Sequence, residues 1–530
     1  MLKRFLICIG LLGILLLLPF VMRPKTTDIP LAPEHDKLVI ITAHTKSIRD
    51  EYALAFRKYY QEKYHKDVDL DFRSPGGTSD IMRYIADRYE ANFRIYWESK
   101  KELGPWTEEI AKNFANPRVD WDKNASKAAK NARKIFLESN ISIDIDLMAG
   151  GGTFELSRNA DRGFAVDGQV ALRHPEYFGE DKLPESFGGD KIYDKQGRFY
   201  GVVISTFGIS CNLDRVAKLP GNPVPKTWSD LANPIFFNSI CLADPSKSGS
   251  ANKCYEIIIQ QCMAQAGNPE QGWVNGVNLL KKIFANSRLI TESAGAAVRD
   301  VAIGNSAVGM AIDTYGMSEV AWQENIFNNK PRVRYITPKG GTAISADPIQ
   351  LLRGAPNKKV AQEFIDFLLS EAGQKLHCFK PGTPGGPVKY QLNRPPARKD
   401  IYTKENLPYF FDKDYNPYKS GADFIYRPAW TGRYYTLLRT LLKNIIIDTA
   451  PELKLAWKAI IDAGGPEKVP QAMAKFNELP FTYKEASLAA KQIRPYPGHS
   501  PKDVSAYLRN WSSQARQNYL EAAKLAKKGL

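Results

Sequence analysis

VDLDFRSPGGTSDIMRYI, residues 68–85, joins a predicted strand to a predicted helix through a Gly-rich loop. The same order precedes it in the chain: KLVIITAH (37–44) is a predicted buried strand, and SIRDEYALAFRKYYQEKY (47–64) is a predicted helix with apolar residues at helical spacing. Strand, short loop and helix, occurring twice in succession, are typical of a parallel α/β sheet. The sequence therefore predicts an α/β fold.

The α/β pattern is interrupted once and then continues in a second unit. Residues 96–140 are rich in Lys, Asn and Ala, and they predict a helical insertion. SIDIDLMAG (142–150) restores the first sheet, and a second α/β unit runs from there to about residue 340. Its predicted strands are GVVISTFGISCN (201–212), SICLAD (239–244) and SAVGMAID (306–313), and its predicted helices lie near 250–265, 270–286 and 294–304. Beyond residue 388, Pro- and Tyr-rich loops give way to further helices.

The N-terminal segment predicts export from the cytoplasm. Lys3 and Arg4 precede an uncharged apolar stretch at residues 5–22, which is the pattern of a signal peptide. No small-residue cleavage site follows, and the stretch nearly reaches the length of a bilayer span, so an uncleaved membrane anchor is the alternative. Residues 1–25 are therefore a signal peptide or an anchor, 26–37 a polar linker, and the rest is expected to be periplasmic.

Composition and missing motifs exclude several classes of protein. The chain of 530 residues carries a net charge of +16, which suggests an anionic partner, but its basic residues are scattered and fit no nucleic-acid-binding motif. Hydrolase, nucleotide-binding and zinc-protease motifs are absent, so we expect no enzyme and no cofactor. Five cysteines beyond Cys8 show no metal-binding spacing, and buried free thiols are favoured over disulfides.

Four other loops share the composition of the loop at residues 74–79, so the chain has five loops rich in Gly, Ser, Thr or Ala. They lie at the starts of predicted helices: AHTKS (43–47), SPGGTS (74–79), AGGGT (149–153), ADPSKSGSA (243–251) and ITESAGAA (290–297). In open α/β sheets such loops surround the ligand crevice, and the N–H groups of helix N-termini suit an anion. Gly, Ser and Thr are also ordinary helix caps, and Asp80 already satisfies the dipole of its own helix. The presence of five such loops in one chain nevertheless favours a shared ligand cleft.

Several segments, in their order along the chain, resemble bacterial extracellular solute-binding proteins of ABC importers. These segments are PKTWSDLANPIF (225–236), ADPSKSGSA (243–251), AAVRDVAIGNSAVGMAIDTYG (296–316) and DPIQLLRGAPNKKVAQEFIDFLLSEAGQKL (347–376). The chain is similar in particular to the group with ferric-ion, thiamine, phosphonate and putrescine-type binders. The resemblance covers roughly residues 38–388, so the insertion at 96–140 and residues 389–530 depart from the family pattern.

The resemblance implies a two-lobed periplasmic-binding-protein fold of type II, with two crossovers and a ligand between the lobes. Lobe one would comprise residues 38–155 and a return segment at 341–388, lobe two residues 156–340, and 389–530 would be a C-terminal extension. A membrane permease would be the partner of a monomeric binder. The ligand-binding residues carried over by position are His44, Gly76, Gly77, Thr78, Gly151, Gly152 and Thr153 in lobe one, and Ser248, Gly249, Ser293, Asp313 and Tyr315 in lobe two.

The sequence is compatible with three kinds of ligand and with two functional roles. The Gly/Ser/Thr loops favour a small oxyanion such as a phosphonate, a phosphorylated compound or a carboxylate. An iron site from His44, Glu292, Asp313 and Tyr315 is an alternative, although the adjacent tyrosine pair of ferric binders is missing here. A thiamine-like or polyamine cation is a third ligand. A membrane-anchored ligand-sensing module is the alternative from another functional class.

Overall fold

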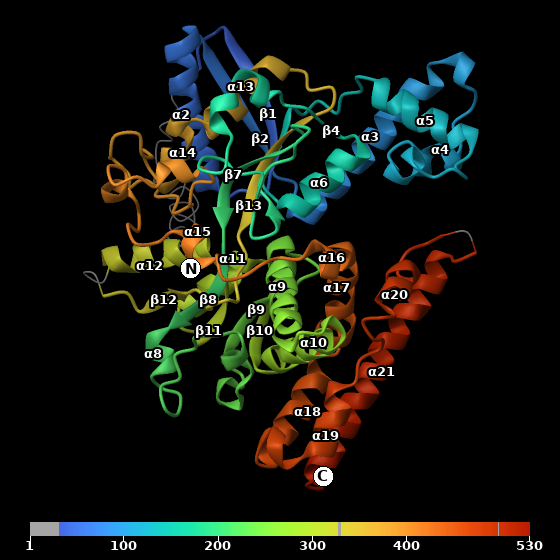
Figure 1. The fold of residues 1–530 in the computed structure, drawn as a ribbon, viewed down its shortest axis with the longest axis vertical. Coiled ribbons are helices and arrows are strands. Elements are labelled where there is room, and N and C mark those ends of the chain that lie inside the picture. The colour runs from blue at the N-terminus through green and yellow to red at the C-terminus, as the bar shows by residue number, and fades with distance from the viewer. Residues whose placement is uncertain (1–30, 327–329, 497) are drawn as a thin grey trace, which may run out of the picture.

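A mixed six-stranded sheet forms lobe one of the computed structural model, which describes residues 31–326, 330–496 and 498–530 (Figure 1). Its strand order is β2-β1-β3-β13-β4, with β7 also paired to β13. The strands are β1 (His35–Thr42), β2 (Asp67–Arg73), β3 (Leu147–Ala149), β4 (Ala165–Val166), β7 (Tyr200–Ser205) and β13 (Ser345–Leu352). The helices of this lobe are α2 (Lys46–Tyr64), α3 (Thr78–Glu98), α6 (Thr153–Arg162), α7 (Val170–Arg173), α13 (Lys358–Leu369) and α14 (Glu371–Cys378).

Strand β1 is buried on both faces, as expected for a parallel sheet covered by helices on each side. Leu38 and Ile40 belong to the apolar cluster that contains α2 and α13, whereas Val39 and Ile41 belong to the cluster that contains α3. Alternate side chains therefore hold helices on opposite faces. The parallel pairing of β1 with β2 and with β3 brings the loops after these strands to the same edge of the sheet.

Lobe two contains a five-stranded sheet of order β10-β9-β11-β8-β12. Its strands are β8 (Phe207–Asn212), β9 (Ile240–Ala243), β10 (Ser287–Thr291), β11 (Val308–Ile312) and β12 (Val333–Ile336). Its helices are α8 (Leu213–Val216), α9 (Gly249–Ala266), α10 (Pro269–Ala285), α11 (Ala294–Ala302) and α12 (Asp313–Ile326). The predicted α/β class is confirmed, and the five cysteines of the described residues are buried and free.

The first crossing between the lobes lies further along the chain than residue 155, where we expected it. Strand β7 pairs antiparallel with β13 in lobe one, and β8, which begins two residues after β7 ends, pairs with β11 in lobe two. The apolar run at 201–212 therefore forms two strands in two different sheets, joined at Thr206. Only the short polar pair Ser205–Thr206 marks the crossing, because the chain is buried on both sides of it.

The insertion forms a small helical unit at the end of α3. It contains α4 (Glu108–Asn113), the short helix η2 (Pro117–Asp120) and α5 (Lys127–Glu138), and it projects from the side of lobe one (Figure 1). Phe93 and Trp97 of α3 pack into the same apolar cluster as Phe114 and Phe136 of the insertion. Helix α3 thus runs into the segment where we expected the insertion and contributes Phe93 and Trp97 to the shared core.

The C-terminal extension packs on both lobes. Its helices are α15 (Pro417–Ser420), α16 (Pro428–Thr431), α17 (Tyr435–Leu442), α18 (Ala450–Asp462), α19 (Pro470–Asn477), α20 (Ala486–Gln492) and α21 (Pro501–Lys527). Leu392, Ala397 and Tyr418 join the core of lobe one, whereas apolar residues from Phe424 onward join the core of lobe two. The chain therefore passes between the lobes a third time near residues 420–424.

Two expectations about the N-terminus lie outside the described residues. The predicted signal peptide or anchor at 1–25 and part of the linker at 26–37 fall within residues 1–30. Among the residues that the structure does describe, no helix combines the length and the apolar character that crossing a bilayer requires.

Candidate functional site

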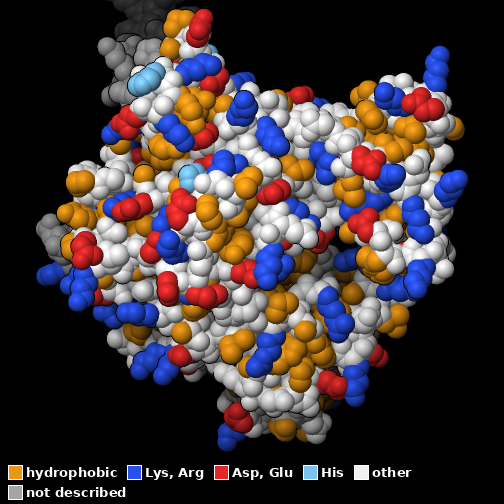
Figure 2. Space-filling view, turned by 45° about the horizontal axis from the view of Figure 1, so that its top comes forward, with side chains coloured by type: hydrophobic (Ala, Val, Ile, Leu, Met, Phe, Trp, Pro, Cys, Tyr) orange, Lys and Arg blue, Asp and Glu red, His pale blue; other side chains and the backbone are white. Residues whose placement is uncertain are grey.

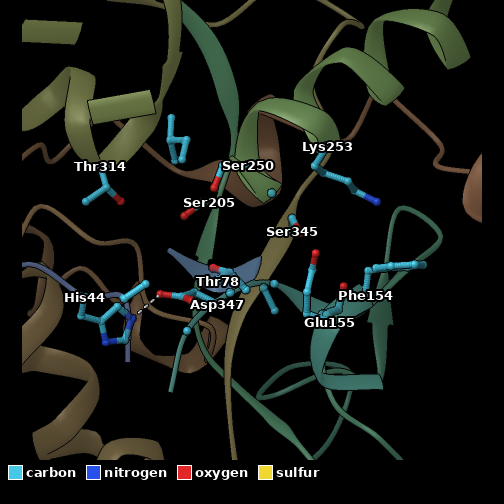
Figure 3. Close-up of a pocket in the computed structure, with 18 of the residues that line it drawn as sticks. His44, Thr78, Phe154, Glu155, Ser205, Ser250, Lys253, Thr314, Ser345 and Asp347 are labelled. Carbon is cyan, nitrogen blue, oxygen red and sulfur yellow. Dashed lines mark hydrogen bonds and ion pairs between the residues drawn. The ribbon is translucent and has the colours of Figure 1, made fainter. Parts of the chain in front are cut away.

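A cleft lies where the two lobes meet, and it contains about 940 Å³ of space free of protein atoms, part of it open to solvent. Both lobes and the extension line it (Figure 3). The lining residues are Ala43, His44, Ile48, Thr78, Gly150–Glu155, Ser205, Phe207, Gly249, Ser250, Lys253, Ile312, Thr314, Tyr315, Ser345–Asp347, Arg394 and Tyr435.

The first turns of several helices open onto this cleft. Helices α3 and α6 of lobe one place Thr78 and Thr153 in its wall, and α9 of lobe two places Gly249 and Ser250 there. The first N–H groups of a helix have no partner within the helix, and they carry a partial positive charge. The cleft therefore offers N–H and hydroxyl donors from both lobes.

Three successive glycines shape the loop between β3 and α6. Gly150, Gly151 and Gly152 have φ values of +84°, +112° and +91°, a region that other residues rarely adopt. A Cβ on Gly150 would come within 2.7 Å of His44 Nε2, and a Cβ on Gly151 within 2.6 Å of Thr78 Cγ2. The glycines thus allow the loop to pack directly against two other residues of the cleft.

An ion-paired group lies on the lobe-one side of the cleft. His44 Nε2 lies 2.9 Å from Asp347 Oδ2, and Arg394 donates to the same carboxylate (Figure 3). Burial alone would raise the pKa of Asp347, but His44, Arg394 and the Gly151 N–H together hold the pKa well below its usual value. Arg394 also donates to Tyr52 Oη at 3.0 Å. Asp347 is therefore an ionised carboxylate that fixes His44 and Arg394.

Glu155 is the second carboxylate of the cleft. It points out of α6 toward the side where Ser250 and Lys253 lie (Figure 3), and a Cβ on Gly249 would lie 3.5 Å from Glu155 Oε1. Burial raises the pKa of Glu155 to about 7, although Arg439 and Arg158 act in the opposite direction. Lys253 is engaged elsewhere, because its Nζ lies 3.1 Å from Asp190 and 3.5 Å from Glu256. Glu155 is thus a proton-binding group beside the first turn of α9.

Seven of the predicted residues lie in the wall of this single cleft. They are His44, Thr78, Gly151, Gly152, Thr153, Gly249 and Tyr315. The sequence thus pointed to segments from both lobes that the fold does bring together.

The glycines of the loop at 73–78 do not line the cleft. The Gly77 N–H donates to Asp80 Oδ2 at 3.1 Å and forms a capping box, and a Cβ on Gly76 would collide with the same carboxylate. The first turn of α3 thus satisfies its own N–H groups with Asp80. Gly76 and Gly77 shape the cap, and only Thr78 reaches the cleft.

Two predicted serines act as helix caps outside the cleft wall. Ser248 accepts a hydrogen bond from the Ala251 N–H at 3.2 Å, and Ser293 accepts one from the Ala296 N–H at 3.2 Å. Both hydroxyls are the expected N-cap acceptors of α9 and α11. The helix that Ser248 caps still reaches the cleft through Gly249.

Asp313 belongs to a buried hydrogen-bonded group at the lobe crossing. Its Oδ2 accepts from the Thr206 N–H and from Tyr415 Oη, each at 2.8 Å. Thr206 Oγ1 in turn lies 3.1 Å from Tyr335 Oη. Thr206 lies at the first crossing between the lobes. Tyr335 lies in β12, just before the second crossing, and Tyr415 lies in the segment that leads to the third. Asp313 therefore ties the three crossings together and does not line the cleft.

The structure does not bring the predicted iron ligands together. Glu292 is 80% exposed and pairs with Lys247, and Asp313 is occupied at the crossing. Only His44 and Tyr315 of that set line the cleft. Within the described ranges, no three side chains of His, Cys, Asp or Glu are grouped so that they could hold a metal ion.

Five important cleft residues escaped sequence analysis: Asp347, Arg394, Glu155, Lys253 and Tyr435. Asp347 lies within the family-like segment at 347–376, but nothing local distinguishes it from a turn residue. Arg394 and Tyr435 lie beyond residue 388, where the resemblance ended. Glu155 and Lys253 are in the first turns of helices whose preceding loops were recognised, so extending each loop by one turn would have included them.

The comparison with family models identifies part of the chain. Residues 178–403 match the family described as "Bacterial extracellular solute-binding protein", which confirms the resemblance seen in the sequence. This central part of the chain is therefore similar to solute-binding proteins of that family. The match spans both crossings between the lobes and includes Arg394 of the cleft.

Two curated relatives match over shorter stretches. An uncharacterized protein of Haemophilus influenzae is 26% identical over 176 residues, which are 33% of this chain and 46% of that protein. The phosphoglycerate transport regulatory protein PgtC of Salmonella typhimurium is 25% identical over 175 residues, or 33% of this chain and 39% of PgtC. The alignments thus span less than half the length of either relative.

Among solved structures, the periplasmic binding protein AfuA from Actinobacillus pleuropneumoniae, with fructose-6-phosphate bound, is similar to this chain. The superposition covers 74% of this chain and 95% of AfuA, with 20% sequence identity and a TM-score of 0.46.

Proposed function

We propose that this protein is the substrate-binding component of an ABC-type importer. It would capture a small solute between its lobes outside the cytoplasm and deliver it to a membrane permease. The similarity of residues 178–403 to solute-binding proteins and a cleft lined by both lobes support this role. A ligand that contacts both lobes stabilises the closed arrangement, which a permease can distinguish from the open one. The protein would release its solute unchanged.

The ligand that fits best is a small oxyanion. The observation that carries this choice is the meeting of the first turns of α6 and α9, one from each lobe, in one cleft, because helix N-termini favour negative charge. Asp347 does not oppose an anion strongly, since the guanidinium of Arg394 neutralises it and His44 also contacts it. The curated relative PgtC is named for phosphoglycerate, a compound with both a phosphate and a carboxylate group.

Iron and a cationic amine are weaker candidates. The iron proposal retains only His44 and Tyr315 at the cleft. An amine would need an ionised carboxylate that is free to pair with it, and Glu155 is the candidate, since Asp347 already has two basic partners. Because burial raises the pKa of Glu155 to about 7, this carboxylate is only partly ionised at neutral pH.

A second role, as a ligand-sensing module that regulates a partner at the membrane, rests on a different observation. PgtC is named a transport regulatory protein, so a relative of this chain is associated with regulation. An uncleaved segment at residues 5–22 would favour this role, whereas cleavage would favour a free binder. N-terminal sequencing of the mature protein separates the two.

The oxyanion proposal predicts that two cleft hydroxyls contribute to binding. Thr78→Val with Ser250→Ala should weaken the binding of 3-phosphoglycerate by about 30-fold, since each of the two lost hydrogen bonds contributes about 1 kcal/mol. A thermal-shift series checks this, because ligand at 100 times its Kd should stabilise the intact protein by about 2.7 kcal/mol. Ser505→Ala on α21 is the control. If a panel of phosphonates, phosphorylated compounds and carboxylates leaves the melting temperature of the intact protein unchanged, the oxyanion proposal is wrong.

A further inference from the structure

Five arginines from three separate parts of the chain lie close together beside the cleft. They are Arg158 and Arg162 of α6, Arg439 of α17, Arg494 just after α20, and Arg118 of the insertion. Arg158 lies within electrostatic range of Arg162, Arg439 and Arg494. Arg494 in turn lies within range of Arg118 and Arg439. We call these five residues the arginine cluster.

Helix packing explains why the two central members of the arginine cluster meet. The rings of Phe154 and Tyr435 lie with their centroids 4.3 Å apart, and they join the first turns of α6 and α17. Arg158 and Arg439 each follow four residues later, so each lies one turn further along, on the same side as the aromatic contact. Helix α17 also contacts α20, which positions Arg494. The cluster is therefore a product of tertiary packing.

The arginine cluster has no counter-ions of its own. None of its five side chains forms an ion pair with a carboxylate in the part of the chain that the structure describes, unlike Arg173 and Arg198, which pair with Asp366 and Asp194. Elsewhere on the surface, basic side chains are interspersed with acidic ones, as Figure 2 shows for one face. Partial burial, together with repulsion from Arg162, Arg439 and Arg494, lowers the pKa of Arg158 to about 10, while part of its side chain stays open to solvent. The fold thus holds like charges together without neutralising them.

The cluster adjoins the cleft but is distinct from it. Phe154, Glu155 and Tyr435 line the cleft, and Arg158 and Arg439 are one helical turn beyond them, about 6 Å along each helix. Glu155 interacts electrostatically with Arg158, and it belongs to the cleft wall. Arg118, Arg158 and Arg494 are exposed to solvent, so an anion can reach them.

We propose that the arginine cluster is a second anion-binding site, which takes a phosphate group carrying more than one negative charge. Guanidinium groups bind phosphate oxygens in pairs of parallel hydrogen bonds, and several of them around one group fit a multiply charged oxyanion. The phosphate group belongs either to a small soluble molecule or to a lipid headgroup. This site does not depend on what the cleft itself binds.

The test measures the binding of pyrophosphate to the full-length protein by calorimetry at fixed ionic strength. Arg158→Gln with Arg439→Gln should weaken binding at least 10-fold. The matched control is Arg94→Gln with Arg509→Gln, which removes the same net charge from exposed sites on α3 and α21 and should leave the affinity within 2-fold. Because Arg158 and Arg439 have no ion pair to lose, their double variant should melt at or above the temperature of the parent protein.

A second arm identifies the source of the phosphate. Flotation with phosphatidylcholine vesicles, with and without phosphatidic acid, detects a lipid headgroup, and both double variants are compared again. Vesicle binding that needs phosphatidic acid and is lost only in the Arg158/Arg439 variant assigns the site to a lipid, whereas pyrophosphate binding with the same dependence assigns it to a soluble ligand. The proposal is wrong if neither probe binds, or if the two double variants reduce binding equally.

Discussion

Glu155 is the residue of the cleft whose charge is most sensitive to pH. The residue as a whole is 6% exposed. Its carboxyl group has no basic partner within ion-pair distance among the described side chains. Burial raises the pKa of Glu155 from the usual value of 4.5 to about 7. Between pH 4.5 and about pH 7, the folded protein therefore keeps a proton on Glu155 that the unfolded chain has already released.

This shift predicts how stability depends on pH. The contribution of Glu155 is fully present below pH 4.5 and is lost as pH rises through 7, which amounts to about 3 kcal/mol for a shift of this size. Glu155→Gln cannot ionise, so its free energy of unfolding relative to the parent should rise between pH 4.5 and 7 and then level off. Urea unfolding at a series of pH values measures the difference.

Glu98→Gln, an exposed change on α3, is the control for this prediction, and its difference from the parent should stay nearly constant with pH. A Glu155→Gln difference that is equally flat would show that Glu155 ionises normally in the folded protein.

At the scale of elements, the C-terminal extension is part of the core of lobe two. Trp457 of α18 is fully buried, and its Nε1 donates to Asn286 Oδ1 at 2.7 Å, at the end of α10. Asn286 in turn donates to the carbonyl groups of Leu231 and Asn233. One continuous apolar cluster contains residues of α9, α10 and the helices from α17 to α21.

This packing predicts that the extension and lobe two unfold together. Trp457→Ala should lower the free energy of unfolding by about 3–5 kcal/mol, since it removes a large buried side chain and leaves a cavity. Leu455→Ala, on the exposed side of the same helix, should change it by less than about 0.5 kcal/mol. Denaturant unfolding should show one transition for these elements. An early separate transition of the extension in Trp457→Ala would contradict a shared core.

The sequence predicted elements well where hydrophobic periodicity was local. The helices expected near 250–265, 270–286 and 294–304 are α9, α10 and α11, within two residues at each end. It failed at 201–212, because the chain is mostly buried on both sides of the crossing and only the short polar pair Ser205–Thr206 marks it. Helix capping also limited the prediction of the site. Gly77, Ser248 and Ser293 lie in loops with the composition of a ligand-binding loop, yet their hydrogen bonds cap the helices that follow them.

Contacts between distant segments decided the rest of the site. Arg394 reaches Asp347 across 47 residues, and Tyr435 reaches Phe154 from the extension. Neither pairing leaves a local pattern in the sequence. Asp313 shows the opposite error: the family resemblance predicted a ligand contact for it, but the segment before the third crossing supplies Tyr415, which donates to its carboxylate.

At the scale of the whole molecule, three crossings rather than two connect the lobes. The extension leaves lobe one after Tyr418 and enters the core of lobe two at Phe424. Tyr426 N–H donates to the Gly188 carbonyl at 2.6 Å, so the third connection also holds a loop of lobe one. The lobes that enclose the cleft are therefore linked on more than one side, and the extension contributes directly to the cleft through Tyr435.

The central claim is that a cleft between the lobes captures a small oxyanion and returns it unchanged. Native mass spectrometry of the protein purified from cells that export it, combined with metal analysis of the same sample, tests this most directly. We predict a metal-free protein carrying a small anionic molecule, which is released intact on denaturation and is lost from the Thr78→Val, Ser250→Ala variant. Stoichiometric bound iron, or a released molecule that the protein has chemically altered, would contradict the claim.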